Sequence, residues 1–355
     1  MLNFTVGPVM SEPDVLEIAN RSTPYFRTPE FSEVMLDNER MILEMLNAPK
    51  NSRCVFLTSS GTGAMESMVM NILNENDRVI VINGGSFGHR FVELAELHDR
   101  PFTEVKCEFG KQLRREQLDG LEDNTALLIN MHETSSGVLY DMKMVAEFCK
   151  ENNILLLVDA ISSFIADELD MTELGAAAVI TGSQKALAVQ PGVAVMALTP
   201  EALRRIDENK EVCMYLSLKQ ALQNGQRGQT PFTPAVTTLL QIHTRLQGII
   251  SRGGVQEERN IIASVAADFR NGIKDLPFEF VSEFPSNAVT ALRPVNGHAK
   301  EIVRILKDEY QIWGCPNGGE LADEVFRIGH IGHITKEDNQ KLIDALHDMK
   351  ERSLL

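Results

Sequence analysis

Apolar residues form short runs that alternate with amphipathic stretches over the first two thirds of the chain. Runs without a polar face predict strands that are buried on both sides. These runs span 54–58, 78–82, 126–131, 154–158, 178–181 and 193–198. Helical spacing fills the gaps, as in 63–73 and 142–151. The alternation predicts an α/β fold with a mostly parallel central sheet and helices on both faces. The last two runs are too close for a helical crossover, so one of them is expected to run antiparallel.

The pattern changes after Pro234, where two long helical stretches flank the sequence SRGG at 251–254. The glycine pair predicts a helix stop and a hinge. Sparser elements follow at 287–292, 299–310 and 324–329, and Thr335 with Asp338 predicts the capped start of a last helix. We therefore expect a large α/β domain over 15–252 and a smaller α+β domain formed by 1–14 and 253–355.

Composition narrows the classes of partner. The 355 residues are 43% hydrophobic, which suffices for two domains, and 34 Lys and Arg against 50 Asp and Glu give a formal charge of −16. That charge disfavours nucleic acid and anionic membranes as partners. The five cysteines include no C-x-x-C pair, no apolar run approaches the ~20 residues of a membrane helix, and the start lacks a signal-peptide pattern. We expect a soluble cytoplasmic protein with reduced thiols.

An acidic residue, Asp159, directly follows the fully apolar stretch 155–158. A carboxylate at the end of a strand buried on both faces is costly unless a cation lies beside it. The position therefore predicts a buried carboxylate with a functional partner.

The segment TSSGTGAMES at 58–67 joins a predicted strand to a helix through small residues. Such a turn lets the backbone close around an anion at the N-terminus of the helix. It is neither a Walker A loop nor a complete G-x-G-x-x-G motif, because Glu66 stands at the third glycine position. Taken alone, it fits a phosphate cup and an ordinary tight turn equally well.

A lysine, Lys185, follows another apolar strand within ITGSQKALA at 180–188. Ligands of open α/β sheets bind at the carboxyl ends of the strands, where Asp159 is also expected. Shelter from water lowers the pKa of an ammonium group and frees the amine to attack a carbonyl. A phosphate cup, a buried carboxylate and a sheltered lysine together match pyridoxal 5′-phosphate, whose phosphate, pyridine nitrogen and aldehyde need these three partners.

The chain resembles the class V aminotransferase family of pyridoxal-phosphate enzymes, in particular its alanine–glyoxylate and serine–pyruvate group. The resemblance rests on the order and spacing of motifs along nearly the whole chain: VGP, YFRTPEF, SSGTGAMES, NGGSFGHR, HETSSGVL, LLLVDAISS, TGSQKALAVQPG, FTPAV and FRIGHIG. It implies a fold-type-I pyridoxal-phosphate transferase.

The resemblance also implies roles for individual residues. Lys185 matches the Schiff-base lysine and Asp159 the partner of the pyridinium nitrogen. The other implied cofactor-binding residues are Ser60, Gly61, Thr62 and Gln184 at the phosphate, Phe87 stacked on the ring, and Thr134 with a hydroxyl beside it. Arg327 and Gly7 match substrate-binding positions, with Arg327 gripping the α-carboxylate. Thr233 matches a phosphate ligand that the neighbouring subunit supplies, which implies a homodimer with shared active sites.

The implied activity is transfer of an amino group from a small amino acid, such as alanine or serine, to glyoxylate or pyruvate. The alternative is 2-aminoethylphosphonate–pyruvate transamination. A cysteine desulfurase is disfavoured, since Gln184 stands where those enzymes have histidine, and a non-catalytic nucleotide binder leaves Lys185 and Asp159 unexplained. No metal site is expected, because His330 and His333 lack a third ligand. Arg27 is open to two readings, a structural arginine or one that reaches the neighbour's substrate pocket.

Overall fold

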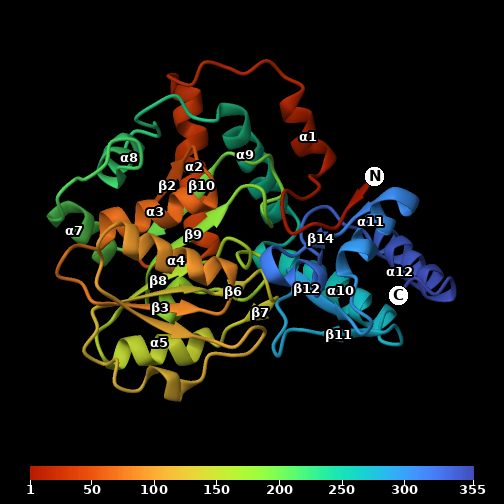
Figure 1. Ribbon diagram of the computed structural model, residues 1–355. Helices are drawn as coiled ribbons and strands as arrows, with labels where there is room; N and C mark the ends of the chain where they lie inside the picture. Colours follow the sequence, from red (N-terminus) through yellow and green to blue (C-terminus); the bar gives the residue numbers. More distant parts are fainter.

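The computed structural model describes residues 1–355 and has a large lobe and a small lobe (Figure 1). The large lobe is built on a seven-stranded sheet in the order β2-β10-β9-β8-β5-β3-β4. The strands are β2 (Arg53–Leu57), β3 (Val79–Asn83), β4 (Phe102–Lys106), β5 (Ala126–Asn130), β8 (Leu155–Asp159), β9 (Ala176–Gly182) and β10 (Ala194–Leu198). Only β10 runs antiparallel to its neighbours. This confirms the mostly parallel sheet and the expectation that one of the two strands predicted at 178–181 and 193–198 runs antiparallel.

Helices cover both faces of this sheet, as the apolar strands require. Leu155 and Leu157 of β8 pack in one buried cluster with α3, α4, α7 and α8, whereas Leu156 and Val158 pack in another with α2, α5 and α9. The helices are α2 (Pro29–Met45), α3 (Gly61–Ile72), α4 (Ser86–Leu97), α5 (Met142–Glu151), α6 (Met171–Leu174), α7 (Pro200–Glu208), α8 (Leu218–Gly225) and α9 (Val236–Ser251). Alternate residues of one strand thus point to opposite layers.

One strand of the seven-stranded sheet, β4, was not expected from the sequence. It lies at the edge of the sheet, and of its five residues only Val105 is buried. Because one side of an edge strand is open to water, its sequence, FTEVK, has no continuous apolar run.

The small lobe contains an antiparallel sheet in the order β11-β12-β15-β14, packed against three helices. Its elements are β11 (Phe278–Phe280), β12 (Val289–Pro294), β14 (Cys315–Pro316), β15 (Phe326–Gly329), α10 (Val255–Gly272), α11 (Ala299–Tyr310) and α12 (Lys336–Glu351). Thr335 and Asp338 form a reciprocal capping box at the start of α12, which confirms the expected helix start. No helix of the protein is both long enough and apolar enough to cross a bilayer.

The N-terminal segment also lies beside the small lobe (Figure 1). Strand β1 (Leu2–Asn3) pairs in parallel with β13 (Ile312–Trp313), and Phe4 is fully buried in the core of the small lobe. The chain then enters the large lobe through α1 (Pro13–Ala19), whose Val15 belongs to the core of that lobe. The short elements β6 (His132–Glu133), β7 (Val138–Leu139) and two 3-10 turns, Arg115–Leu118 and Gly319–Asp323, complete the fold.

The two lobes are joined again where α9 ends and α10 begins. Gly253 and Gly254 lie between these helices with φ of 115° and 84°, a backbone region that favours glycine. We propose domain boundaries at this glycine pair and just before Val15, so that residues 15–252 form the large domain and 1–14 with 253–355 the small one.

Candidate active site

Lys185 lies three residues beyond the carboxyl end of β9 and is almost fully buried. Its Nζ donates a hydrogen bond to the carbonyl of Val6 at 2.5 Å. Gly7 allows this approach, because a Cβ at that position would lie 2.8 Å from Cδ of Lys185. Burial, and then the positive charge of Arg327, lower the pKa of Lys185 to about 8. The amine is thus far closer to its neutral, nucleophilic form at physiological pH than a surface lysine is.

Asp159 is the last residue of β8 and is also buried. Its carboxylate accepts a hydrogen bond from the backbone N–H of Ile161 at 2.7 Å and another from the side-chain amide of Asn130. Asn130 ends the neighbouring strand β5 in register with Asp159. Burial raises the pKa of Asp159 to about 6, against the lowering by these hydrogen bonds. A cation beside this carboxylate would favour its ionised form.

The predicted phosphate cup lies at the N-terminus of α3. Ser60 is the N-cap residue, but its side chain accepts no hydrogen bond from the helix, and the first turn contains no acidic residue. The first backbone N–H groups of a helix have no partner within it, so this end can bind an anion. A Cβ on Gly61 would lie 2.3 Å from Ile161, which shows that the cup contacts the loop after Asp159.

The N-terminus of α4, which holds Phe87, is arranged differently. Glu133 is fully buried, and its carboxylate accepts hydrogen bonds from the backbone N–H groups of Phe87 and Gly88, the latter at 2.9 Å. A carboxylate from another element therefore caps this helix and fixes the first turn. Of the two helix ends, only that of α3 is free for an external anion.

Thr134 belongs to a buried chain of polar side chains. Its hydroxyl lies 2.7 Å from that of Ser162, which in turn lies 2.9 Å from Nδ1 of His132. Burial, followed by the charges of Lys185 and Arg327, lowers the pKa of His132 to about 3, so the ring is neutral. Its Nε2 is buried and has no hydrogen-bond partner in the protein.

Arg327 lies in β15, so the small lobe contributes this side chain to the site. Its guanidinium donates to the carbonyls of Thr134 at 3.2 Å and Pro316 at 2.9 Å, and it contacts Sγ of Cys315. Its Nε is buried without a partner. The guanidinium lowers the pKa of Lys185, so the two cations act on the same region. Such a pair is suited to an anionic substrate.

Gln184 and Thr233 are placed less tightly. Gln184 is half-buried, and its carbonyl accepts from the backbone of Val9 at 3.3 Å. Thr233 is exposed and makes no hydrogen bond to the other residues of the site. Arg27 donates to the carbonyls of Thr230 and Pro231 within the same chain, at 3.0 Å and 3.3 Å, and so holds the segment before Thr233.

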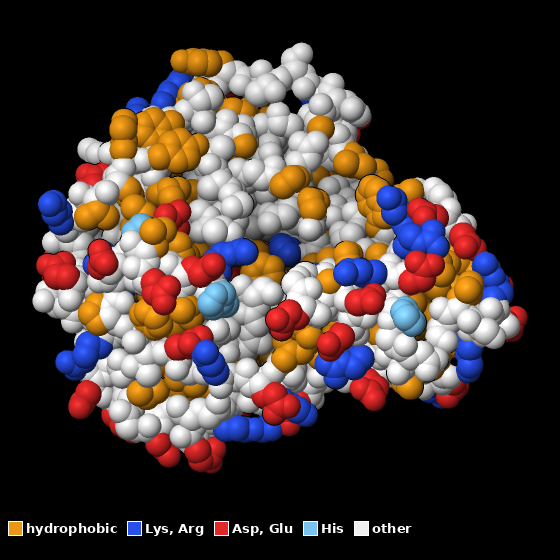
Figure 2. All heavy atoms as spheres, in the orientation of Figure 1, with side chains coloured by type: hydrophobic (Ala, Val, Ile, Leu, Met, Phe, Trp, Pro, Cys, Tyr) orange, Lys and Arg blue, Asp and Glu red, His pale blue; other side chains and the backbone are white.

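These observations fit a phosphorylated pyridine aldehyde. The uncapped end of α3 suits its phosphate, Asp159 its ring nitrogen and Lys185 its aldehyde, while the buried Nε2 of His132 and Oδ1 of Asn130 lack partners in the protein. Lys and Arg side chains gather where the two lobes meet in the middle of the face seen in Figure 2.

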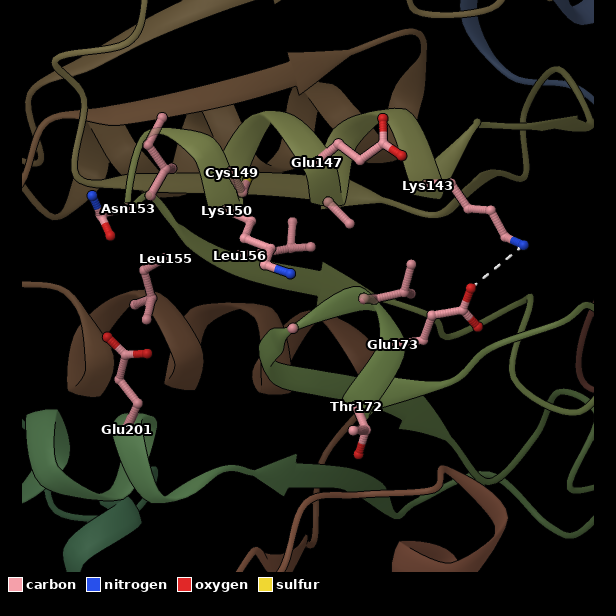
Figure 3. A pocket seen from close by; sticks show the side chains of 14 residues that line it. Lys143, Glu147, Cys149, Lys150, Asn153, Leu155, Leu156, Thr172, Glu173 and Glu201 are labelled. Atoms are coloured by element: carbon pink, nitrogen blue, oxygen red, sulfur yellow. Dashed lines mark ion pairs between the residues drawn. The ribbon is translucent and has the colours of Figure 1, made fainter.

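A separate hollow of about 590 Å³ lies elsewhere, between α5, α6 and the start of α7 (Figure 3). It is lined by Asn153 and Leu155 at the amino end of β8, and an ion pair between Lys143 and Glu173 spans one side. Since Asp159 ends the same strand, this hollow lies at the opposite edge of the sheet from the site. No group of three or more His, Cys, Asp or Glu side chains is arranged to hold a metal ion.

Fold and site together define a fold-type-I transferase that uses pyridoxal 5′-phosphate. The family model described as aminotransferase class-V matches residues 19–313, and the chain belongs to this family. It is therefore a pyridoxal-phosphate-dependent transaminase, as its resemblance to the class V enzymes indicated.

Individual relatives match over nearly the full length. A soluble hydrogenase 42 kDa subunit of Anabaena cylindrica is 30% identical over 90% of this chain and 85% of that protein. A serine–glyoxylate aminotransferase of Arabidopsis thaliana is 28% identical over 94% of this chain and 86% of that protein. The crystal structure of a subgroup IV aspartate aminotransferase from Thermus thermophilus is 27% identical, covers 99% of each chain and superposes with a TM-score of 0.92.

Three residues of the site, Asn130, His132 and Glu133, were not predicted from the sequence to belong to it. Asn130 and Asp159 both end apolar strands with a polar residue, and this shared pattern was the available signal for Asn130. Glu133 has no such signal, because it acts on α4 through a contact across 45 residues. His132 resembles any packed histidine until its unpartnered Nε2 is located.

Proposed function

We propose that this transaminase moves the amino group of a small amino acid, of the alanine or serine type, to glyoxylate or pyruvate. The main support is the buried guanidinium of Arg327, which lies in the site of Lys185 and has a free Nε. A planar guanidinium binds a carboxylate through two parallel hydrogen bonds, and all these substrates have an α-carboxylate. The serine–glyoxylate relative supports a donor of this size.

In this proposal each residue has one task. Arg327 holds the carboxylate and thereby orients the α-carbon toward Lys185. Lys185, with its lowered pKa, takes the α-proton and later returns a proton, as a general base and acid. The cofactor, when bound, supplies the aldehyde that accepts the amino group and a ring that withdraws electrons, and Asp159 keeps its ring nitrogen protonated.

We also propose a homodimer with shared active sites. Thr233 is exposed at the start of the segment that leads into α9. The stacked rings of Tyr215 and Phe232, with centroids 5.5 Å apart, lie beside it, and Tyr215 is 56% exposed. A neighbouring subunit would cover these rings and receive Thr233 at its phosphate cup. Within the same subunit, Gly7, which lies next to the side chain of Lys185, is proposed to contact the substrate, and Gln184 is proposed to contact the phosphate.

The donor is identified by half-reactions of the wild-type enzyme. The loaded enzyme is mixed separately with alanine, serine, aspartate and 2-aminoethylphosphonate, and loss of its visible absorbance band is followed in a stopped-flow instrument. We expect alanine or serine to remove the band fastest. Aspartate is included because the Thermus structure is that of an aspartate aminotransferase. A response to the phosphonate alone would replace the proposed substrate and leave the transaminase assignment intact.

Replacing Arg327 with lysine tests the carboxylate contact. Lysine keeps the charge but loses the two-pronged geometry, so donor affinity should fall by about 2–3 kcal/mol if the contact is shielded from water. The measurement is the concentration dependence of the half-reaction, with Arg293→Lys on the neighbouring strand β12 as the control. Unchanged donor affinity in the Arg327 variant would contradict the assignment.

A further inference from the structure

The phosphate cup has no basic residue of its own. Residues 58–63 are uncharged, and the nearest charged residue in the loop motif is the anion Glu66, which lies 3.2 Å from the ring of His98. The protein as a whole has a formal charge of −16, which opposes the approach of a phosphate dianion. The free N–H groups of α3 provide partial positive charge, and a full positive charge has to come from another element.

Arg90 of α4 is a basic side chain that contacts the cup. Its Nη1 donates a hydrogen bond to Oγ1 of Thr62 at 3.1 Å. No other Lys or Arg side chain is hydrogen-bonded to residues 58–63. Arg90 is half-buried, so its charge is less screened than that of a fully exposed arginine.

The direction of this hydrogen bond matters. A threonine hydroxyl has one hydrogen and two lone pairs. Because Arg90 donates to one lone pair of Thr62, the hydroxyl hydrogen remains free to be donated to an anion. The contact therefore orients the hydroxyl as a donor at the N-terminus of α3 and polarises it at the same time.

Arg90 also contacts the ring proposed to stack on the cofactor. It lies one helical turn after Phe87, and its Cζ is 5.3 Å from the centroid of that ring. The N-terminus of α4 is itself closed by Glu133, so this helix contributes to the cup through a side chain and not through its backbone.

We propose that Arg90 is a positioning residue of the phosphate subsite, which directs the hydroxyl of Thr62 toward the phosphate group and adds the positive charge that the cup lacks. This inference depends on the cofactor and is independent of which amino donor the enzyme uses.

The test compares two ligands that differ only in the phosphate. Cofactor-free wild-type and Arg90→Gln proteins are each titrated with pyridoxal 5′-phosphate and with pyridoxal in equilibrium dialysis. We expect the variant to bind the phosphorylated ligand about 10- to 100-fold more weakly, the range for loss of a charge-assisted hydrogen bond, and pyridoxal less than about 3-fold more weakly. The affinity of Arg90→Lys, which keeps the charge, for pyridoxal 5′-phosphate should lie between those of the wild-type and Arg90→Gln proteins. Equal weakening of both ligands, or weakening of neither, would overturn the proposal.

Two further variants separate positioning from a general structural effect. Arg115→Gln is the matched control, since Arg115 also lies over an aromatic ring, 4.7 Å from the centroid of Phe148, and is expected to leave the ratio of the two affinities unchanged. In a Thr62→Val background, Arg90→Gln should still change that ratio, but clearly less than it does in the wild-type protein, because the hydroxyl is gone and only the effect of the charge remains. A full additional loss in that background would contradict action through Thr62.

Discussion

Replacing Lys185 with alanine is expected to lower the rate of transamination by on the order of 10⁴-fold, the upper range for loss of a general acid–base residue. The reason is that one amine both binds the cofactor and moves the proton. The rate is measured with the donor that the half-reactions identify. Borohydride reduction of the wild-type enzyme should fix the cofactor mass to the peptide containing Lys185, and attachment to another lysine would refute the site assignment.

The same amine should give the wild-type enzyme a characteristic pH dependence. Since the pKa of Lys185 in the cofactor-free protein is about 8, the amine is protonated below that pH and neutral above it. Covalent binding of the cofactor should therefore accelerate as the pH rises through about 8 and then level off.

The control for the Lys185→Ala variant is Lys143→Ala, at the hollow on the opposite edge of the sheet. Methylamine should restore part of the activity of Lys185→Ala by replacing the missing base.

Replacing Asp159 with asparagine is expected to lower transamination at least about 10²-fold, comparable to removal of one preorganised charge contact. An amide cannot balance a positive ring nitrogen, so the bound ring should lose its proton and its capacity to withdraw electrons. Binding through the phosphate cup should persist. Turnover and the absorbance of the bound cofactor are the measurements.

Asp167→Asn provides a matched control for this variant. Asp167 is also buried with its pKa raised to about 6 by burial, but its carboxylate bonds to Ser286 and Asn287 at the contact between the lobes. Its replacement should lower thermal stability and change turnover far less. Near-normal turnover in Asp159→Asn would show that Asp159 has only a structural role.

Much of the large lobe could be predicted because its chemistry is local in sequence. Asp159 and Lys185 each follow an apolar strand within a few residues, and a charged group in that position has few structural explanations. The same strands are apolar on both faces, which predicts helices on both sides. Fold and cofactor were thus accessible from sequence pattern and resemblance.

The remaining features depend on contacts between distant segments. Arg90 and Glu133 are ordinary charged residues in the sequence, and their importance lies in hydrogen bonds to Thr62 and Gly88, 28 and 45 residues away. The edge strand β4 escaped prediction because four of its five residues are not buried. Roles that depend on a second subunit, such as that proposed for Thr233, have no expression in the pattern of a single chain.

The N-terminal segment gives the enzyme a mechanical link between its two lobes. Leu2 and Asn3 are paired with β13 and Phe4 is anchored in the small lobe, yet the carbonyl of Val6, two residues later, receives the hydrogen bond of Lys185 in the large lobe. Because Val6 comes only two residues after Phe4, this segment can lengthen very little if the small lobe rotates. A rotation of the small lobe about Gly253 and Gly254 would therefore also move the carbonyl that accepts the hydrogen bond of Lys185.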